Sequence, residues 1–197
     1  MHAFNLRLFE LINAGDHVGL PMLLATRVVA QWLILLVPVI WLVLWFGADE
    51  RDRLDLLHVL LSAMLALGIA QLVGFAFPSP RPFALHLGHQ YLPHVNDPGL
   101  PSDHATLLWS LAFGALGTAR ASWLVFPFLA VGLVVGWARV YLGVHFPFDI
   151  AAALPVAAMG AGLAWAMRSS VRRHARPWVA RYDRWQRLLL ERLLHTD

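Results

Sequence analysis

The sequence contains no cysteine and no lysine, and charged residues make up only 14% of its 197 residues. Without cysteine, the chain can form neither a disulfide framework nor a thiolate metal site. Soluble domains carry about 25% charged and about 45–50% apolar residues, whereas this chain is 59% hydrophobic with a mean hydropathy of +0.61. Low charge and high hydropathy predict an integral membrane protein, and the length predicts a single domain over residues 1–197.

All fifteen basic side chains are arginines, and eight of them lie between Arg168 and Arg192. A basic cluster that follows the last apolar segment is typical of the cytoplasmic end of a membrane protein. This cluster explains the sequence pI of about 10.2 without a nucleic acid partner, and we expect none.

Five apolar segments approach the roughly 20 residues that a membrane-spanning helix needs. The third is short, which suits a helix that begins below the membrane surface and is shielded by protein. Prolines inside three segments are tolerated where neighbouring helices satisfy the freed carbonyls. The chain is therefore predicted to be an all-α, multi-pass membrane helical bundle with spans at Val28–Phe46, Leu56–Phe77, Ala105–Ala119, Trp123–Val144 and Ile150–Met167.

Two flanking segments are predicted to be amphipathic helices in contact with membrane lipids. Near the N-terminus, Phe4, Leu8, Leu11 and Ile12 recur at helical spacing. The tail, residues 168–197, combines an aromatic and leucine face with arginines, as does a helix that lies on an anionic membrane surface. The start of the chain lacks the features of a removable signal peptide, so we expect the first span to act as an uncleaved insertion signal.

Arginine counting predicts the orientation. With the loop Phe77–His104 outside, eleven arginines lie on the inner side and four on the outer side, as the positive-inside rule favours. The loop and the N-terminus are therefore expected at the outer face and the tail in the cytoplasm. The sequence carries no signal that predicts an oligomeric state.

Three polar segments interrupt the apolar pattern, and all fall on this outer face. Ionisable residues at the edge of a span are costly to bury and are therefore functional candidates. Arginine is well suited to phosphate oxygens, and a histidine backed by a carboxylate is an activated nucleophile or base. A phosphate-handling active site is predicted from Arg81, Ser102, Asp103, His104, Arg139, His145 and Asp149.

Each candidate also has a purely structural explanation. Arg81 or Arg139 alone could snorkel to lipid headgroups. Ser102 could cap a helix, although that helix start would itself offer amides to a phosphate. Either histidine alone could be an interfacial or structural residue. Their occurrence together on one face favours the active site.

The three segments together resemble the signature motifs of the type-2 phosphatidic acid phosphatase superfamily, which also contains vanadium haloperoxidases. The resemblance extends from Gly74 to Asp149. The second motif has aspartate where glycine is usual, and with Arg-Val-Tyr-Leu-Gly-Val-His it is similar to the BcrC-type undecaprenyl-diphosphate phosphatases in particular. The matching segments are Arg81-Pro82, Pro101-Ser102-Asp103-His104 and Arg139-x5-His145-x3-Asp149.

The resemblance implies a role for each residue. His145 would attack the terminal phosphorus to give a phosphohistidine, with Asp149 fixing its tautomer. His104 would protonate the leaving oxygen and then activate water. No metal or other cofactor is expected. The phosphate would be bound by Arg81, Arg139 and Ser102, with Asp103 facing one of the two arginines, because an unpaired carboxylate would oppose a diphosphate.

Two positions depart from the superfamily pattern. Gly74 stands where the first motif begins with lysine, and Ala138 stands where the third motif often begins with serine. One hydroxyl contact is therefore absent, and another donor must replace the lysine unless the site works with fewer. The candidates for that donor are His86, His89 and His94.

The resemblance implies that undecaprenyl diphosphate is hydrolysed to undecaprenyl phosphate and inorganic phosphate in a bacterial cytoplasmic membrane. This reaction would recycle the cell-wall lipid carrier and lower bacitracin sensitivity. The nearest alternative is a phosphatase for phosphatidylglycerophosphate, phosphatidate or lipid A. A different class is a transporter or an inactive scaffold. A transporter more often has paired half-helices, and a scaffold would be expected to have lost part of the catalytic set.

Overall fold

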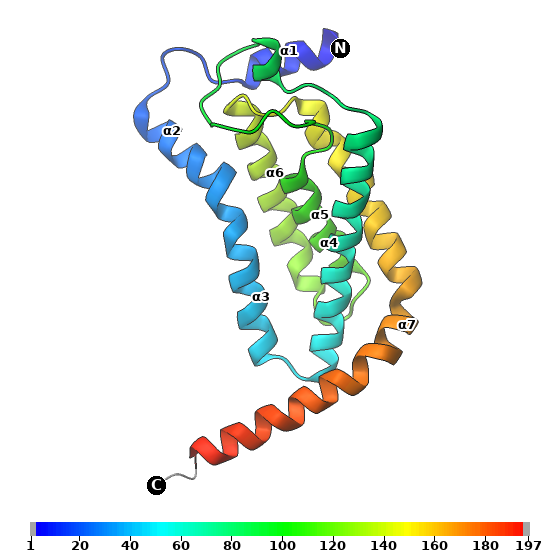
Figure 1. Cartoon of the computed structure of the whole chain (residues 1–197). Coiled ribbons are helices and arrows are strands. Elements are labelled where there is room, and N and C mark those ends of the chain that lie inside the picture. The colour runs from blue at the N-terminus through cyan, green and yellow to red at the C-terminus, as the bar shows by residue number, and fades with distance from the viewer. Residues whose placement is uncertain (1–2, 195–197) are drawn as a thin grey trace.

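Every regular element is a helix in the part of the chain that the computed structural model describes, residues 3–194. This confirms the prediction of an all-α multi-pass bundle, and the long helices stand side by side (Figure 1). The elements are α1 (Ala3–Ile12), α2 (Leu20–Arg27), the π-helical turn η1 (Val28–Trp32), the 3-10 turn η2 (Leu33–Leu35), α3 (Leu36–Gly47), α4 (Glu50–Ala76), the 3-10 turn η3 (Pro82–Leu85), α5 (Asp103–Leu116), the 3-10 turn η4 (Ser122–Leu124), α6 (Val125–Tyr141) and α7 (Pro147–Leu194).

Four helical stretches within the described residues are long and apolar enough to cross a membrane: Leu20–Gly47, Glu50–Ala76, Ser122–Tyr141 and Pro147–Leu193. The predicted third span corresponds to α5, which has only 14 residues. At 1.5 Å per residue α5 is about 21 Å long, shorter than a hydrocarbon core of about 30 Å. It packs between α4, α6 and α7, and this enclosure permits a short helix.

The first membrane helix begins earlier than predicted, at Leu20 rather than Val28. The prediction started after Thr26 and Arg27 because polar residues are unusual inside a membrane-spanning segment. The Thr26 hydroxyl is buried and donates to the Met22 carbonyl (2.6 Å) within the helix. Arg27 donates through Nε to the carbonyl of Tyr91 (2.8 Å) and so attaches the helix to the long loop. Thr26 is thus satisfied within its own helix, and Arg27 makes a hydrogen bond to the long loop.

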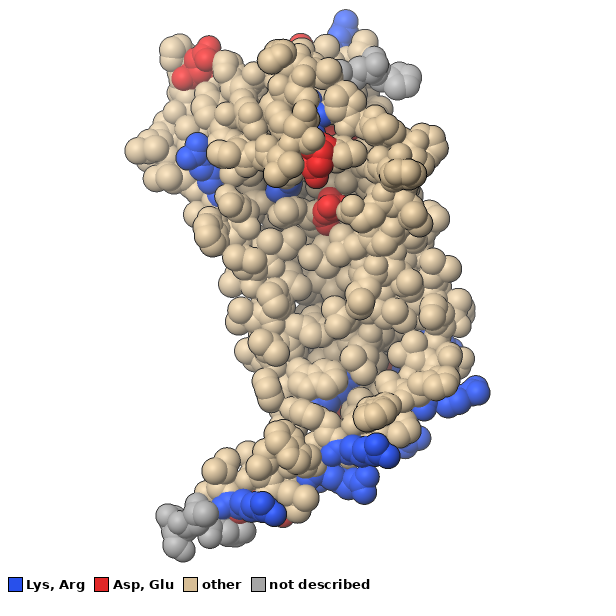
Figure 2. All heavy atoms as spheres, in the orientation of Figure 1, with Lys and Arg blue, Asp and Glu red and all other residues tan. Residues whose placement is uncertain are grey.

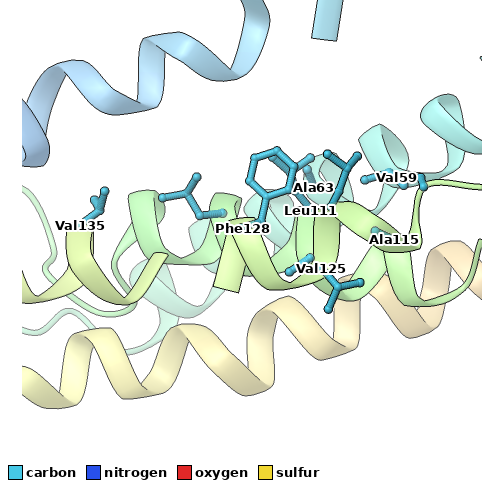
Figure 3. Close-up of a cluster of buried hydrophobic side chains, with 11 residues drawn as sticks. Val59, Ala63, Leu111, Ala115, Val125, Phe128 and Val135 are labelled. Carbon is cyan, nitrogen blue, oxygen red and sulfur yellow. The ribbon is translucent and has the colours of Figure 1, made fainter. Parts of the chain in front are cut away.

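The core forms where α4, α5 and α6 meet. Val59 and Ala63 of α4 face Leu111 of α5 and Phe128 of α6 (Figure 3). The contact between α4 and α7 is closer still, because a methyl group added at Gly160 would lie 2.6 Å from the backbone nitrogen of Ala66. The helices therefore approach through small residues, as is common in membranes.

Helix α1 lies across the end of the bundle where α6 and α7 are joined (Figure 1). Its Phe9 is completely buried and packs edge-on against Phe146, with ring centroids 5.2 Å apart. Asn5 is also buried, and its side-chain oxygen accepts a hydrogen bond from the amide of Phe148 (3.0 Å). Phe4 and Leu11 of the predicted apolar face are exposed and so available to lipid, whereas Ile12 of that face packs against the cluster that contains Phe9. The buried side of α1, which the sequence pattern missed, docks the helix on the bundle.

The tail is a continuation of the last span rather than a separate helix. Helix α7 runs from Pro147 to Leu194, contains Pro155 and Pro177, and turns beneath the bundle in its distal part (orange to red in Figure 1). Proline removes a backbone hydrogen bond and bends a helix without ending it when packing supports both sides. Residues 195–197 of the predicted tail lie outside the described part of the chain.

Charge is concentrated at the two ends of the molecule. Figure 2 shows arginines gathered over the tail end, a middle band without charge, and a smaller number of charged residues at the loop end. An uncharged belt between two charged ends is what a bilayer requires of a spanning protein. The chain is therefore a membrane protein.

Substitution of Gly160 by alanine should destabilise the bundle by about 1–3 kcal/mol, because the added methyl group meets the α4 backbone and neither helix can yield cheaply. Gly162 is the matched control, since nothing lies within 4 Å of a methyl group there. Thermal unfolding of both purified variants measures the difference. Equal melting temperatures would show that the contact between α4 and α7 is looser than described.

Candidate active site

The loop between α4 and α5 crosses the end of the bundle and carries Arg81 into it. The Arg81 side chain is almost completely buried, with 4% of its surface exposed. Its Nε donates to both the carbonyl and the carboxylate of Asp97 (3.0 Å each), and its Nη1 donates to the carbonyl of Val144 (2.9 Å). Arg81 therefore joins the loop to the turn between α6 and α7.

That turn supplies a histidine and a carboxylate in contact. Oδ2 of Asp149, in the first turn of α7, accepts a hydrogen bond from the amide of Phe146 (2.8 Å) and lies 3.3 Å from Nδ1 of His145. Nε2 of His145 is 3.0 Å from Nη1 of Arg81. Because arginine can only donate, Nε2 must be the acceptor and Nδ1 carries the proton that points to Asp149. One tautomer satisfies both contacts.

The environment keeps this imidazole neutral. His145 is 1% exposed, and its burial lowers the pKa of the ring well below the usual range, with the charges of Arg139 and Arg81 acting in the same direction. A neutral imidazole with an unprotonated Nε2 and a carboxylate behind Nδ1 has the arrangement of an oriented nucleophile.

Arg139, in the last turn of α6, is the second arginine of the cluster and contacts two histidines. Its Nη2 is 2.9 Å from Nε2 of His94, and its Nη1 is 3.4 Å from Nε2 of His104. The Nη1 group also donates to the carbonyl of Ala30 (3.3 Å). Its Nε is buried and has no hydrogen-bond partner in the described chain. The structure thus brings both predicted arginines and both predicted histidines to one end of the bundle.

Ser102 stands at the N-cap position of α5 but does not cap the helix with its side chain. Its amide donates instead to the carbonyl of Asp149 (3.0 Å) and ties the start of α5 to the start of α7. The Ser102 hydroxyl is buried without a partner among the described residues, as is that of Thr106 one turn later. Buried polar atoms are normally hydrogen-bonded. The Ser102 hydroxyl and Arg139 Nε are therefore groups that a phosphate could satisfy, and Thr106 is a further buried hydroxyl of α5 that the motif comparison missed.

Asp103 was predicted to face Arg81 or Arg139, and the charges of both arginines do act on its carboxyl, but its hydrogen bonds among the described residues go to a different side chain. Both Asp103 carboxylate oxygens accept from Nε2 of Gln71 in α4 (3.1 and 3.2 Å). The carboxylate that pairs with Arg81 belongs to Asp97. Asp103 is the first residue of α5 and lies on the side of that helix that faces α4, whereas Asp97 comes from the loop that surrounds Arg81.

The loop also occupies the space around Gly74, where the superfamily motif has lysine. A methyl group at Gly74 would already lie 3.3 Å from the carbonyl of Leu100. Of the three histidines proposed as substitutes, His94 contacts Arg139 and lies edge-on to His145, with ring centroids 6.4 Å apart. Burial lowers the pKa of His94, and the charges of Arg81 and Arg139 add to this effect.

The other two histidines do not contact these catalytic candidates. His89 pairs with Asp16 (3.3 Å), beyond the end of α1. His86 ends the 3-10 turn η3 in the left-handed conformation, at φ 54°. His94 is therefore the one of the three whose position suits a replacement for the lysine.

Residues 55–173 match the sequence profile of the PAP2 superfamily. The chain belongs to the PAP2 superfamily. The match begins within the first two turns of α4, runs through α5 and α6, and ends about halfway along α7. It therefore includes every residue of the candidate site.

Named relatives match beyond this region. One relative is YbjG of Escherichia coli K12, which is named as a provisional undecaprenyl-diphosphatase. It is 33% identical to this chain, and the match covers 79% of this chain and 78% of the YbjG chain. Undecaprenyl-diphosphatase BcrC of Bacillus subtilis is 27% identical over 78% of each chain. The crystal structure of Aquifex aeolicus LpxE has the same fold, with a TM-score of 0.67, 21% identity and coverage of 83% of this chain and 95% of that one.

Replacement of Ser102 by alanine should leave the melting temperature nearly unchanged but weaken inorganic phosphate binding by about fivefold to tenfold, because the hydroxyl has no protein partner to lose. Thermal shift with increasing phosphate measures both quantities. The matched control is Ser62→Ala, which removes a buried hydrogen bond to the Ser110 carbonyl (2.9 Å). The control should cost about 1 kcal/mol of stability and leave phosphate binding intact. The reverse result would make Ser102 a structural residue.

Proposed function

We propose that this protein, a lipid phosphatase of the PAP2 superfamily, hydrolyses undecaprenyl diphosphate to undecaprenyl phosphate and inorganic phosphate. The observation that carries the proposal is the neutral His145, with Nδ1 directed to Asp149 and Nε2 in contact with Arg81. The names of the YbjG and BcrC relatives support the diphosphate lipid as substrate. A site at one end of a membrane bundle also suits a lipid whose chain stays in the bilayer.

The first step is attack by Nε2 of His145 on the terminal phosphorus. Before the attack, a phosphoryl oxygen takes over the Nη1 donor of Arg81 from the imidazole, which frees the Nε2 lone pair. In the empty site burial and the charge of Arg139 lower the pKa of His104 to about 3, so the ring must first take a proton from water, which the negative charge of the bound diphosphate favours. The bond from phosphorus to the bridging oxygen then breaks, and protonated His104 donates that proton to the leaving oxygen. Asp149 stabilises the positive charge that develops on the ring.

The second step is hydrolysis of the phosphohistidine. Deprotonated His104 takes a proton from water, the water oxygen forms a bond to phosphorus, and the bond to Nε2 breaks to release inorganic phosphate. Arg81 and Arg139 offset the charge on the phosphoryl oxygens in both steps. The hydroxyl of Ser102 would contribute a further hydrogen bond. Asp103 would orient the start of α5 through Gln71 rather than bind phosphate directly.

His94 would take the place of the superfamily lysine. In the empty site the neutral ring accepts from Arg139. A bound diphosphate adds negative charge, which favours the protonated ring, and the imidazolium could then donate to a phosphoryl oxygen. This exchange supplies the missing cationic donor without a lysine.

Purified protein should release phosphate from undecaprenyl diphosphate in preference to phosphatidate and phosphatidylglycerophosphate, with EDTA present throughout. His145→Gln should lower the rate by at least about 1,000-fold, as loss of a covalent nucleophile does in other hydrolases. His89→Gln is the matched control, because that ring lies outside the site, and it should retain the wild-type rate. Preference for a glycerolipid would overturn the substrate but keep the mechanism. An active His145→Gln variant would overturn the mechanism.

We further propose that the loop end faces the periplasm or the cell exterior and the tail end the cytoplasm of a bacterial inner membrane, as the arginine distribution favours. The absence of cysteine from the sequence makes the test direct. A cysteine at Val95, which is 76% exposed in the loop, should react with an impermeant maleimide on intact cells. A cysteine at the exposed Arg173 position should react only after the membrane is opened, and the opposite pattern would reverse the orientation.

A further inference from the structure

A hollow of about 1150 Å³ lies at the end of the bundle opposite the catalytic cluster. Its walls are the start of α4, the turn that follows α5 and the distal half of α7, which turns beneath the bundle in Figure 1. Seven arginines and four carboxylates line it. The lining therefore carries an excess of positive charge.

The four carboxylates are already paired with arginines of the same hollow. The pairs are Arg53 with Asp183, Arg172 with Asp55 (2.7 Å), Arg176 with Glu50 (2.8 Å) and Arg120 with Asp49 (2.7 Å). Three arginines remain whose guanidinium groups make no hydrogen bond or ion pair with the described residues: Arg51, Arg184 and Arg187. Three uncompensated guanidinium groups around one hollow favour a phosphate-bearing ligand.

A smaller pocket of about 240 Å³ adjoins this hollow and shares Ala48, Asp55 and Arg120 with it; its charged lining residues, including Asp52, are paired with one another or with Arg172, and the rest of its lining is apolar. Its apolar walls come from the end of α3, the start of α4 and the turn that leads into α6. They include Val43, Leu44, Leu56, Trp123 and Leu124. A basic hollow beside an apolar pocket is complementary to an anionic amphiphile, with its phosphate in the first and the start of its chain in the second.

The hollow is held in place by a buried arginine. Arg53 is 3% exposed, pairs with Asp183 and donates to the side-chain oxygen of Gln186 (2.6 Å). Its guanidinium also lies over the ring of Tyr182, 4.8 Å from the centroid. These contacts fix the distal half of α7 against α4. Trp178 and Trp185 are exposed on the same part of α7, as expected at headgroup depth.

We propose that this hollow is a binding site for the phosphate headgroup of an anionic phospholipid, with the adjoining pocket holding the first part of an acyl chain. Inorganic phosphate offers the same charge without the chain and is the alternative source of the same chemistry. The inference does not rest on the proposed function, because none of these residues belongs to the catalytic cluster.

The test uses native mass spectrometry of the whole detergent-purified protein with phosphatidylglycerol or phosphatidylcholine added. The wild-type protein should retain phosphatidylglycerol in preference. The triple variant R51Q/R184Q/R187Q should bind it at least about tenfold more weakly, given what each arginine contributes near an anionic lipid. The matched control R173Q/R181Q/R192Q removes the same charge from exposed tail arginines outside the hollow and should stay within about twofold of wild type.

Three results would overturn the proposal. Equal loss in the two triple variants would indicate attraction to the tail surface as a whole rather than a site. Equal retention of the two lipids by the wild-type protein would remove the phosphate selectivity. Displacement of phosphatidylglycerol by inorganic phosphate at equal concentration would make the hollow a free-anion site. Thermal shift of each variant without lipid shows that it is folded, so that lost binding is not mistaken for lost structure.

Discussion

The contacts of Arg81 hold the site together, because this one guanidinium joins the loop before α5 to the turn between α6 and α7. It binds the loop at Asp97, the turn at the Val144 carbonyl and the imidazole of His145. A buried arginine is costly unless its donors are used, and here the cost is offset by hydrogen bonds that also position the histidine. The loop, the turn and the start of α7 therefore adopt one arrangement together.

This arrangement explains why α5 is short. A helix that crossed the whole bilayer would fill the end of the bundle with apolar side chains. Helix α5 begins at Asp103, below the loop, and the space at its start is taken by the buried hydroxyl of Ser102 and the two arginines. Helices α4, α6 and α7 surround it, so its polar start is enclosed by protein rather than lipid.

The two ends of the molecule use arginine in different ways. At the loop end, Arg81 and Arg139 are buried, and Arg81 is fully engaged while Arg139 keeps one buried donor free. At the tail end, Arg53 is buried and anchors α7, whereas Arg184 and Arg187 have no carboxylate partner among residues 3–194. Arginine remains charged whether it is buried or exposed. Because the chain has no lysine, arginine provides every cationic side chain that does not titrate near neutral pH.

The sequence by itself determined the all-α membrane architecture, because hydrophobic runs of sufficient length are local properties of the chain, and its motif spacing predicted which residues the structure brings together at the loop end. It indicated His94 only as one of three histidines, and it did not indicate Gln71 as the hydrogen-bond partner of Asp103. It also missed the docking of α1 through Phe9, the continuity of α7, and the unpartnered hydroxyl of Thr106. These features were decided by tertiary structure, because each depends on which residues distant in the chain share a buried volume. Hydrogen-bond partners such as Gln71 for Asp103, 32 positions apart, follow from the packing of α4 against α5 and not from any local pattern.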